Sequence, residues 1–315
     1  MFTLAHLSDL HLAPLPRPRL SELASKRMLG YLNWRHKRAA IHRAEVADAL
    51  VRDLKSQAPD HIAVTGDLVN IALDAEFSQA RAWLDRLGAP ADVTLVPGNH
   101  DAYVRAAIGA PAAHWREFMQ GDGETRLRRA PQDDGIVFPF LRRRGPLALI
   151  GLSTAVPSAP FMATGQLGAE QIGHLGKILA ETSGLFRVVL IHHPPAGRRG
   201  WSKRLIDAAA LRAVLRENGA ELVVHGHDHV HALEWVDGRD RPIPVVGVPS
   251  ASSSGYGGAE HAAYNLYRID GAGGAFTCEL VARGFRAGEP KIGELRREKL
   301  EPLNPTAAPA RTASR

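Results

Sequence analysis

The chain has 315 residues, of which 45% are hydrophobic, so it is long enough to bury a substantial core in one large domain or two. Its net charge of +6 and pI near 9.7 favour anionic partners without choosing among phosphate esters, nucleic acid and membrane surfaces. The single cysteine, Cys278, excludes an internal disulfide framework. No stretch approaches the roughly 18 apolar residues of a membrane span, and the first residues lack a positive n-region. We therefore expect a cytoplasmic protein.

Short β-type runs alternate with longer helical patterns up to about residue 285, and this rhythm predicts an α/β fold with parallel strands. Beyond Pro131, two strands around an arginine-rich turn predict an antiparallel hairpin, after which the alternation resumes. No linker interrupts this body, so we predict one domain over residues 1–285. The predicted strands are 2–7, 61–64, 92–96, 136–141, 146–152, 187–191, 221–224, 232–236, 242–248, 263–269 and 275–282, and the main helices are 41–57, 74–87, 168–181 and 205–217.

Two segments depart from this rhythm. Residues 286–315 consist mostly of charged residues, Pro and Ala, a composition that buries too little apolar area to offset ordering entropy, so we predict a disordered tail. Residues 17–43, here called the insertion, combine apolar residues at helical spacing with many Lys and Arg. The insertion fits either an ordinary packed helix with a solvated basic face or a lid or membrane-surface element, because basic amphipathic helices favour anionic interfaces.

Five short polar clusters each follow directly after an apolar run. In open α/β sheets, functional sites form at the carboxyl ends of the strands. We therefore expect the five clusters to meet at one site. They are Asp9-Leu10-His11, Gly66-Asp67, Gly98-Asn99-His100-Asp101, His192-His193 and His227-Asp228-His229.

The residue types in these clusters are those of a metal site. Asp9 and His11 are two residues apart, and the period of 2 along a strand would project both side chains to one side, as it would for His227 and His229. A carboxylate after the turn at Gly66 has the oxygens to bridge two cations. Oxygen and imidazole ligands without a thiolate suit Mn, Fe, Zn or Co. Two such ions about 3.5 to 4 Å apart can clamp a phosphoryl group and generate hydroxide.

In this order, Asp-x-His, Gly-Asp, Gly-Asn-His-Asp, His-His-Pro-Pro and Gly-His-x-His resemble the calcineurin-like metallophosphoesterases, nearest the branch of the class III cyclic nucleotide phosphodiesterases. The resemblance spans about residues 1–282 and implies a four-layer αββα sandwich of two mixed β-sheets flanked by helices. It also implies two divalent metal ions and catalytic roles for Asp67 and His100, with His100 as the acid that faces the phosphate. The implied ligands are Asp9, His11, Asp67 and His229 for one metal and Asp67, Asn99, His192 and His227 for the other.

Three neighbouring residues are given supporting roles. Motif register favours His192 over His193 as the ligand, which leaves His193 and His225 as donors that orient other groups. Asp101 is expected to orient the Asn99-His100 loop by hydrogen bonds rather than to bind metal.

These observations predict a metal-dependent phosphoric ester hydrolase that acts on a small-molecule phosphate ester, with a phosphodiester as the favoured substrate class. One alternative is hydrolysis of a lipid-linked pyrophosphate such as UDP-2,3-diacylglucosamine, with peripheral contact to an anionic membrane. A second alternative is a nuclease, although the sequence shows neither a basic groove with interspersed aromatic residues nor a known DNA-binding module. Intact ligand motifs argue against a third, a non-enzymatic scaffold. The natural substrate, the metals and the oligomeric state stay open.

Overall fold

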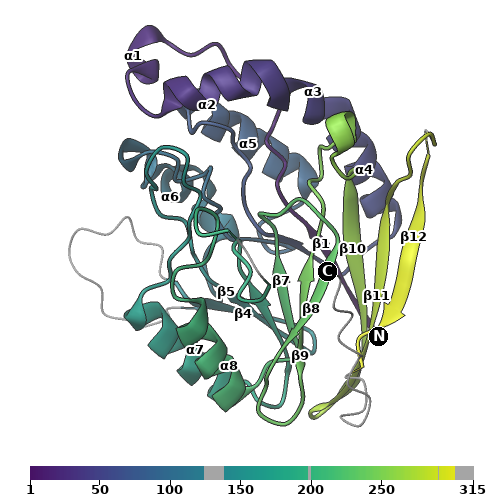
Figure 1. Cartoon of the computed structure of the whole chain (residues 1–315). Helices are drawn as coiled ribbons and strands as arrows, with labels where there is room; N and C mark the ends of the chain where they lie inside the picture. Colours follow the sequence, from purple (N-terminus) through teal and green to yellow (C-terminus); the bar gives the residue numbers. More distant parts are fainter. Residues whose placement is uncertain (124–137, 198–199, 290, 302–315) are drawn as a thin grey trace, which may run out of the picture.

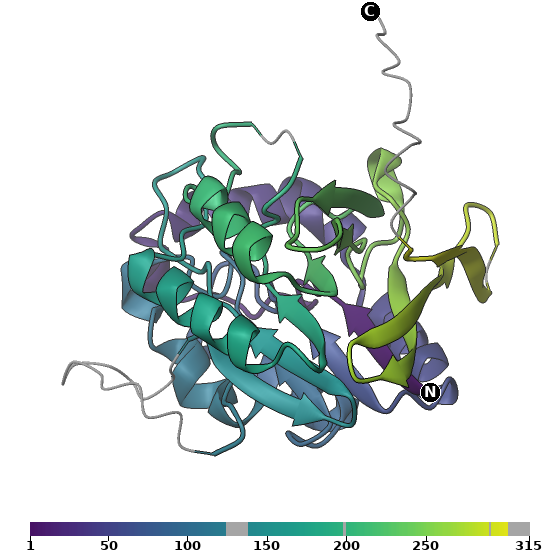
Figure 2. The same cartoon turned by 90° about the horizontal axis from the view of Figure 1, so that it is seen from below.

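Two six-stranded mixed sheets share a core and are flanked by helices on their outer faces (Figures 1 and 2). The computed structural model describes residues 1–123, 138–197, 200–289 and 291–301. The strand order is β12-β11-β10-β1-β2-β3 in the first sheet and β4-β5-β6-β7-β9-β8 in the second. The predicted α/β architecture with two mixed sheets is therefore confirmed.

The first sheet has a parallel half and an antiparallel half. Strands β1, β2 and β3 run parallel, whereas β10, β11 and β12 add to β1 as an antiparallel meander. Helix α4 connects the insertion to β2, and α5 connects β2 to β3, as expected for β-α-β units. The bounds are β1 Phe2–Leu7, β2 His61–Val64, β3 Val93–Leu95, β10 Ala263–Ala272, β11 Ala275–Phe285, β12 Ile292–Lys299, α4 Ala44–Ser56 and α5 Asp74–Leu87.

The second sheet has four parallel central strands, β5, β6, β7 and β9, with β4 and β8 antiparallel at its edges. Helices α7 and α8 pack together on its outer face (Figure 2). The bounds are β4 Phe140–Arg144, β5 Leu147–Gly151, β6 Phe186–Leu190, β7 Leu222–His225, β8 Ala232–Val236, β9 Ile243–Gly247, α7 Ala169–Glu181 and α8 Ala208–Asn218. The shorter helices α6 Ala110–Trp115, η2 Arg105–Ala107, η3 Arg116–Phe118 and η4 Tyr256–Gly258 lie in the connections.

The main core fills the space between the sheets and extends to helices α4 and α5, so the strands are buried by the facing sheet on one side and by helices on the other. Leu4 and Val64 of the first sheet and Val188 and Val224 of the second are fully buried in one cluster. Burial of such side chains stabilises each by about 1.5 to 3 kcal/mol relative to exposure. A separate apolar cluster joins α7 and α8 to the outer face of the second sheet. Both sheets are therefore anchored, and the loops at their strand ends are held in place.

The structure corrects two predictions. Arg142, Arg143 and Arg144 belong to strand β4, and the turn of the hairpin lies at residues 145–146. The tail was predicted to start at residue 286, but β12 pairs with β11 along its length. This edge strand is half-buried and held by ladder hydrogen bonds and by cross-strand ion pairs such as Arg297–Glu279, at 2.7 Å, so its charged composition misled the prediction. Residues 302–315 lie outside the described part.

The insertion lies across one end of the molecule, at the top of Figure 1. It folds into α1 (Leu20–Leu23), α2 (Arg27–Asn33), the π-helix η1 (Trp34–Arg38) and α3 (Ala39–Ile41). The guanidinium of Arg27 contacts the carbonyl oxygens of residues 71 and 72. The ammonium of Lys26 contacts Ser158 and the carbonyl oxygen of residue 162. Among the described residues, no helix has the length and apolar character needed to span a bilayer.

Candidate metal centre

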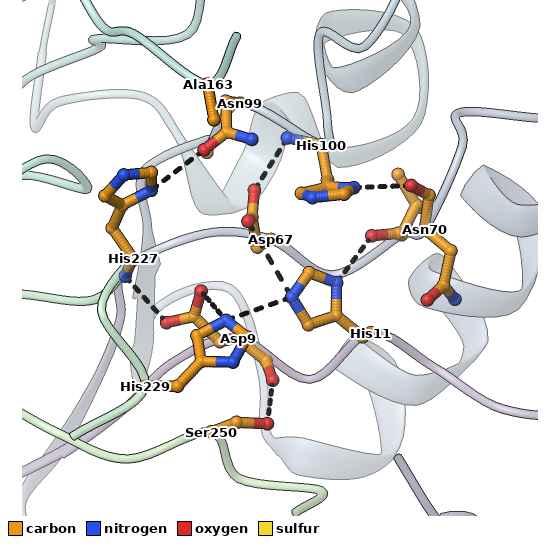
Figure 3. A network of polar contacts seen from close by, with 12 residues as sticks. Asp9, His11, Asp67, Asn70, Asn99, His100, Ala163, His227, His229 and Ser250 are labelled. Carbon is orange, nitrogen blue, oxygen red and sulfur yellow. Dashed lines mark hydrogen bonds and ion pairs between the residues drawn. The ribbon is translucent and has the colours of Figure 1, made fainter. Parts of the chain in front are cut away.

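All five polar clusters converge at the carboxyl ends of β1, β2, β3, β6 and β7. Figure 3 shows residues of four of them, and the fifth joins through His192, which contacts Asp67 and Asn99. The structure thus brings together the residues predicted for one site, although they come from both sheets. The first sheet contributes two carboxylates, one amide and two imidazoles, and the second contributes three imidazoles. The residues are Asp9, His11, Asp67, Asn99 and His100 from the first sheet and His192, His227 and His229 from the second.

The backbone places these side chains differently from the way predicted. Strand β1 ends at Leu7 and β7 at His225, so the Asp-x-His and His-x-His pairs lie beyond their strands. Strand alternation therefore does not align them. Instead the backbone of five candidate ligands has positive φ, which is strained for residues with side chains and costs of order 1 kcal/mol or more each. These are Asp9 (55°), His11 (41°), Asp67 (55°), His227 (73°) and His229 (59°).

One group of ligand atoms surrounds a point between Asp9 and His11. His229 Nε2 lies 3.1 Å from Asp9 Oδ1 and 3.3 Å from His11 Nε2. His11 Nε2 lies 3.8 Å from Asp67 Oδ2. Two atoms that bind one ion with bonds near 2.1 Å lie about 3.0 to 3.4 Å apart at octahedral or tetrahedral angles. The atoms of Asp9, His11 and His229 fit that spacing.

A second group forms around Asn99. Its Oδ1 atom lies 3.2 Å from His192 Nε2 and 3.0 Å from His227 Nδ1. His192 Nε2 in turn lies 3.4 Å from Asp67 Oδ2. Asp67 Oδ2 therefore faces imidazoles of both groups, which is the position a bridging carboxylate needs.

Backbone carbonyls set the tautomers of three imidazoles. His11 Nδ1 lies 3.1 Å from the oxygen of residue 69, His192 Nδ1 2.6 Å from that of residue 65, and His227 Nε2 3.0 Å from that of Lys203. Because a carbonyl only accepts, each of these nitrogens donates its proton. In the neutral form of each ring, the other nitrogen carries a lone pair that is directed into the cluster. Such outer hydrogen bonds are the usual means of orienting metal-binding histidines.

Two glycines permit the close approach of the carboxylates. A Cβ atom on Gly98 would collide with the carboxylate and amide of Asp67, and one on Gly226 would collide with Ser8 and Asp9. Each glycine directly precedes a candidate ligand in its own loop and packs against a candidate ligand of another loop. The motifs Gly-Asn and Gly-His therefore reflect packing between neighbouring loops as well as local turns.

Asp101 holds two of these loops together. Its buried carboxylate accepts hydrogen bonds from the amides of Asp67, Leu68, Val69 and Gly98, at 2.8 to 3.2 Å. Burial and the nearby charge of Asp67 raise its pKa to about 7. The expectation that Asp101 orients the loop by hydrogen bonds is confirmed, and the same carboxylate also fixes the loop that carries Asp67.

The charge states of the cluster suit cation binding. Burial would raise the pKa of Asp9, but His229 and His192 hold it at about 2. Burial lowers the pKa of His227 to about 4 and that of His11 well below its usual value. These carboxylate and imidazole ligands are thus deprotonated near neutral pH. His192 differs: burial lowers its pKa, but the charge of Asp67 and the hydrogen bond to it, the charge of Asp9 and the carbonyl of Thr65 together raise it to about 10. A bound cation would displace that proton.

His193 and His100 are arranged differently from the ligand candidates. Both ring nitrogens of His193 contact groups outside the candidate ligand set, Thr154 Oγ1 at 2.7 Å and the oxygen of Ala163 at 3.1 Å. His100 donates its amide to Asp67 Oδ1 at 2.7 Å, and its ring Nδ1 lies 2.5 Å from the oxygen of Asn70. Its other ring nitrogen is left without a partner from the described residues.

Sequence reasoning missed two side chains that the insertion brings to the site. His42 is buried, with its ring centroid 4.6 Å from that of His11 and 5.8 Å from that of His229. Arg38 reaches to 3.3 Å from His100 Nδ1. Neither belongs to a recognisable motif, and only the closeness of the insertion to the first cluster indicated that it would overhang the site.

Two cavities open onto the cluster. One, the apolar cavity, has a volume of about 410 Å³ and extends from Asn99, His100 and Arg38 to apolar side chains of the insertion and of the loop around residue 161. The other, the ligand cavity, has a volume of about 310 Å³ and contacts Asp67, His42, His227 and His229. Side chains that line the apolar cavity include Lys26, Leu29, Trp34, Tyr103, Phe161 and Met162.

Comparisons with known proteins agree with this arrangement. A cAMP/cGMP dual specificity phosphodiesterase of Mycobacterium tuberculosis is 29% identical over 176 residues, 54% of this chain and 49% of that protein. A probable cyclic nucleotide phosphodiesterase of Synechococcus is 26% identical over 58% of this chain and 63% of that protein. The matched part thus spans about half to two thirds of these relatives.

A dimetal phosphatase from Danio rerio has the same fold, with a TM-score of 0.62 at 13% identity over 96% of this chain and 99% of that one. The family model described as calcineurin-like phosphoesterase matches residues 2–231, which carry all five clusters. Among the described residues, groups of His and Asp side chains from these clusters lie close enough together to hold a metal ion. The chain belongs to the calcineurin-like phosphoesterase family.

Proposed function

We propose that this protein is a metal-dependent phosphoric ester hydrolase, and that a phosphodiester is its substrate. The observation that carries the proposal is the position of Asp67 Oδ2 between two groups of ligand atoms, 3.4 Å from His192 Nε2 and 3.8 Å from His11 Nε2. Two divalent ions bound there would polarise the phosphoryl oxygens and supply a hydroxide nucleophile near neutral pH.

The proposed ligands are those implied by the motifs. Asp67 would serve both ions, and its distances to His11 and His192 support this division into two sets. Oxygen and nitrogen donors without a thiolate suit Mn, Fe, Zn or Co. The first set is Asp9, His11, Asp67 and His229, and the second is Asp67, Asn99, His192 and His227.

His100 is proposed to act on the substrate rather than on a metal. The carbonyl of Asn70 holds its Nδ1 proton, so Nε2 is the atom available to the substrate. Its amide is bound to the Asp67 carboxylate, which fixes the ring beside the cluster. In that position His100 can hydrogen-bond a phosphoryl oxygen or the leaving oxygen, and it can give up a proton there once protonated.

The apolar cavity supports an ester with a bulky group on one side. It starts at His100 and ends among aromatic and aliphatic side chains such as Tyr103, Trp34 and Phe161. A phosphate monoester of a small alcohol would leave this space to water. The curated relatives, which are cyclic nucleotide phosphodiesterases, support the diester class.

Steady-state kinetics on metal-reconstituted protein test the proposal. The panel contains bis(p-nitrophenyl) phosphate, p-nitrophenyl phosphate and cyclic nucleotides, each with Mn²⁺, Fe²⁺, Zn²⁺ or Co²⁺. We expect metal-dependent cleavage, with higher kcat/KM for diesters than for the monoester. Failure of every ester to turn over with any of these metals would overturn the proposal, and a preference for the monoester would overturn the diester assignment.

A second candidate is an amphiphilic, lipid-linked pyrophosphate such as UDP-2,3-diacylglucosamine, hydrolysed at an anionic membrane surface. The supporting observation is the set of exposed apolar side chains on the insertion and on the loops beside it. Leu29 and Phe161 among them line the apolar cavity. The members of the set and their exposed fractions are Leu20 (87%), Met28 (42%), Leu29 (42%), Leu32 (43%), Phe161 (86%) and Trp201 (72%).

Co-sedimentation with vesicles separates the two candidates. If the membrane candidate is right, the protein binds vesicles that contain anionic lipid, and Phe161→Ser and Arg35→Gln each weaken binding. Arg216→Gln, on the exposed face of α8, removes the same charge from another surface and serves as the control. Absence of vesicle binding, or equal effects of both arginine variants, would rule out this candidate. We also propose a cytoplasmic location, which the single, buried thiol of Cys278 supports.

A further inference from the structure

Arg38 is a half-buried cation of the insertion that faces the candidate site. It is the last residue of the π-helix η1, an element often found at functional sites. Its side chain lines both the apolar cavity and the ligand cavity. Its Nη1 atom lies 3.3 Å from Nδ1 of His100. The guanidinium therefore stands where the two cavities meet.

The contact between Arg38 and His100 does not satisfy the guanidinium. His100 Nδ1 lies 2.5 Å from the carbonyl oxygen of Asn70. Figure 3 marks this contact, in which the carbonyl can only accept. Nδ1 therefore carries a proton and has no lone pair for a donor from Arg38. Within the described part of the chain, Arg38 also forms no ion pair with a carboxylate, although it lies in the field of Asp67 and Asp9.

Buried arginines and another half-buried arginine are engaged by protein partners. The guanidinium of Arg142 donates to a set of backbone carbonyl oxygens at 2.6 to 2.8 Å. Arg187 pairs with Glu221 at 2.8 Å, and Arg283 pairs with Asp53 at 2.9 Å. Buried arginines normally find such partners because an unmet charge is costly. Arg38 differs from them in having donors that point into open cavities beside the site.

We propose that Arg38 binds the non-bridging oxygens of the substrate's phosphoryl group beside His100. This inference rests on the proposed function and adds to it a cationic residue outside the family motifs. The planar guanidinium presents paired N–H donors that match two phosphoryl oxygens. Charge accumulates on these oxygens as the nucleophile attacks, and a fixed cation in a partly desolvated site stabilises that charge.

The inference also assigns a task to the insertion. Arg27 and Lys26 attach the insertion to loops of the main body, and these attachments fix the base of the helix that carries Arg38. Arg35 and Lys37 of the same π-helix are exposed. The insertion thus brings the half-buried guanidinium of Arg38 to both cavities, whereas Lys37 lines only the ligand cavity and Arg35 lines neither.

Variants at position 38 test the inference with two readouts. On metal-reconstituted protein we measure kcat/KM for bis(p-nitrophenyl) phosphate and, by calorimetry, the Kd for inorganic phosphate. For Arg38→Gln we expect a loss of about 100- to 1000-fold in kcat/KM and phosphate binding weaker by about tenfold or more, with unchanged metal content. Arg38→Lys should give values between those of wild type and Arg38→Gln, because lysine keeps the positive charge but lacks the planar pair of N–H donors. Arg216→Gln, on the exposed face of α8, is the matched control and should stay within about twofold of wild type in both readouts.

Chemical rescue separates a phosphoryl contact from a structural role. Added guanidinium should restore part of the activity of Arg38→Ala and none of that of Asp67→Asn. Wild-type kcat/KM and phosphate affinity in Arg38→Gln would overturn the inference and leave the diesterase proposal standing. A second combination of results would also overturn the inference. In it, Arg38→Ala is destabilised and guanidinium does not restore its activity, while Arg38→Lys keeps the kcat/KM and the phosphate affinity of wild type. A wild-type protein that cleaves no ester, but whose phosphate affinity depends on Arg38, would overturn the proposed function and support phosphoryl binding.

Discussion

The strand-end loops and the insertion meet at the same cavities but are built in opposite ways. In the loops, Asp9, His11 and Asp67 are buried and their own backbone has a positive φ. The carboxylate of Asp101 accepts hydrogen bonds from the amides around it. The insertion exposes several of its apolar side chains and most of its Lys and Arg residues, and it is attached through contacts such as those of Arg27 and Lys26. Strain that persists is maintained by well-packed surroundings, whereas weakly packed segments open more readily. The loops are therefore suited to fixed chemistry and the insertion to contact with the substrate.

The largest effect should follow from a change in the loops at Asp67. Asp67→Asn removes the charge that faces both groups of ligand atoms. Loss of an outer hydrogen-bond partner lowers activity by roughly 10- to 100-fold, and loss of a direct ligand to both ions should lower it by more than that. Bound metal should fall from two equivalents to one or fewer, as measured by mass spectrometry of the metal content. Asp48→Asn, on the exposed face of α4, controls for loss of a carboxylate. Two bound metals with near-normal turnover in Asp67→Asn would contradict this account.

A change at His100 should affect turnover and spare the metals. His100→Asn keeps the backbone amide that binds Asp67 but removes the imidazole, so kcat should fall by roughly 10² to 10⁴. Metal content should stay at two equivalents. If the variant loses metal in proportion to activity, His100 is a ligand and its proposed role is wrong.

The support provided by Asp101 should matter less for catalysis and more for stability. Asp101→Asn places an N–H group where four backbone amides now find oxygen acceptors. Each donor left unsatisfied costs about 1 to 3 kcal/mol, and displacement of the loops should lower activity about 10- to 100-fold. Denaturant unfolding and kinetics on the same sample measure both. Wild-type stability would show that the two loops do not depend on this carboxylate.

The smallest of these effects should come from the insertion. A Cβ atom on Gly30 would lie 2.7 Å from a methyl group of Ile71 and 2.6 Å from the hydroxyl of Tyr103. Gly30→Ala should therefore push α2 away from the apolar cavity, at a cost of about 1 to 3 kcal/mol. We expect a higher KM for diesters with little change in kcat. A fall in kcat with unchanged KM would instead place the insertion in the chemical step.

The sequence allowed much of this molecule to be predicted, for a local reason. Buried parallel strands are continuous apolar runs, and ligands sit where those runs end, so β2 and the Gly66-Asp67 turn could be located from the pattern alone. The left-handed backbone at Asp9 and His227 could not be predicted from the sequence, because it depends on packing against the surrounding loops. Strand β12 was missed because ladder bonds and charge pairs hold it at an edge. Arg38 and His42 reach the site only through tertiary packing.

An anomalous-scattering map of crystals grown with Mn²⁺ tests the central claim most directly. The account predicts two peaks at the carboxyl ends of β1, β2, β6 and β7, one between Asp9, His11 and His229 and the other between Asn99, His192 and His227, with the carboxylate of Asp67 in contact with both. A single peak, no peak, or peaks away from these side chains under conditions that support phosphodiester cleavage would contradict it.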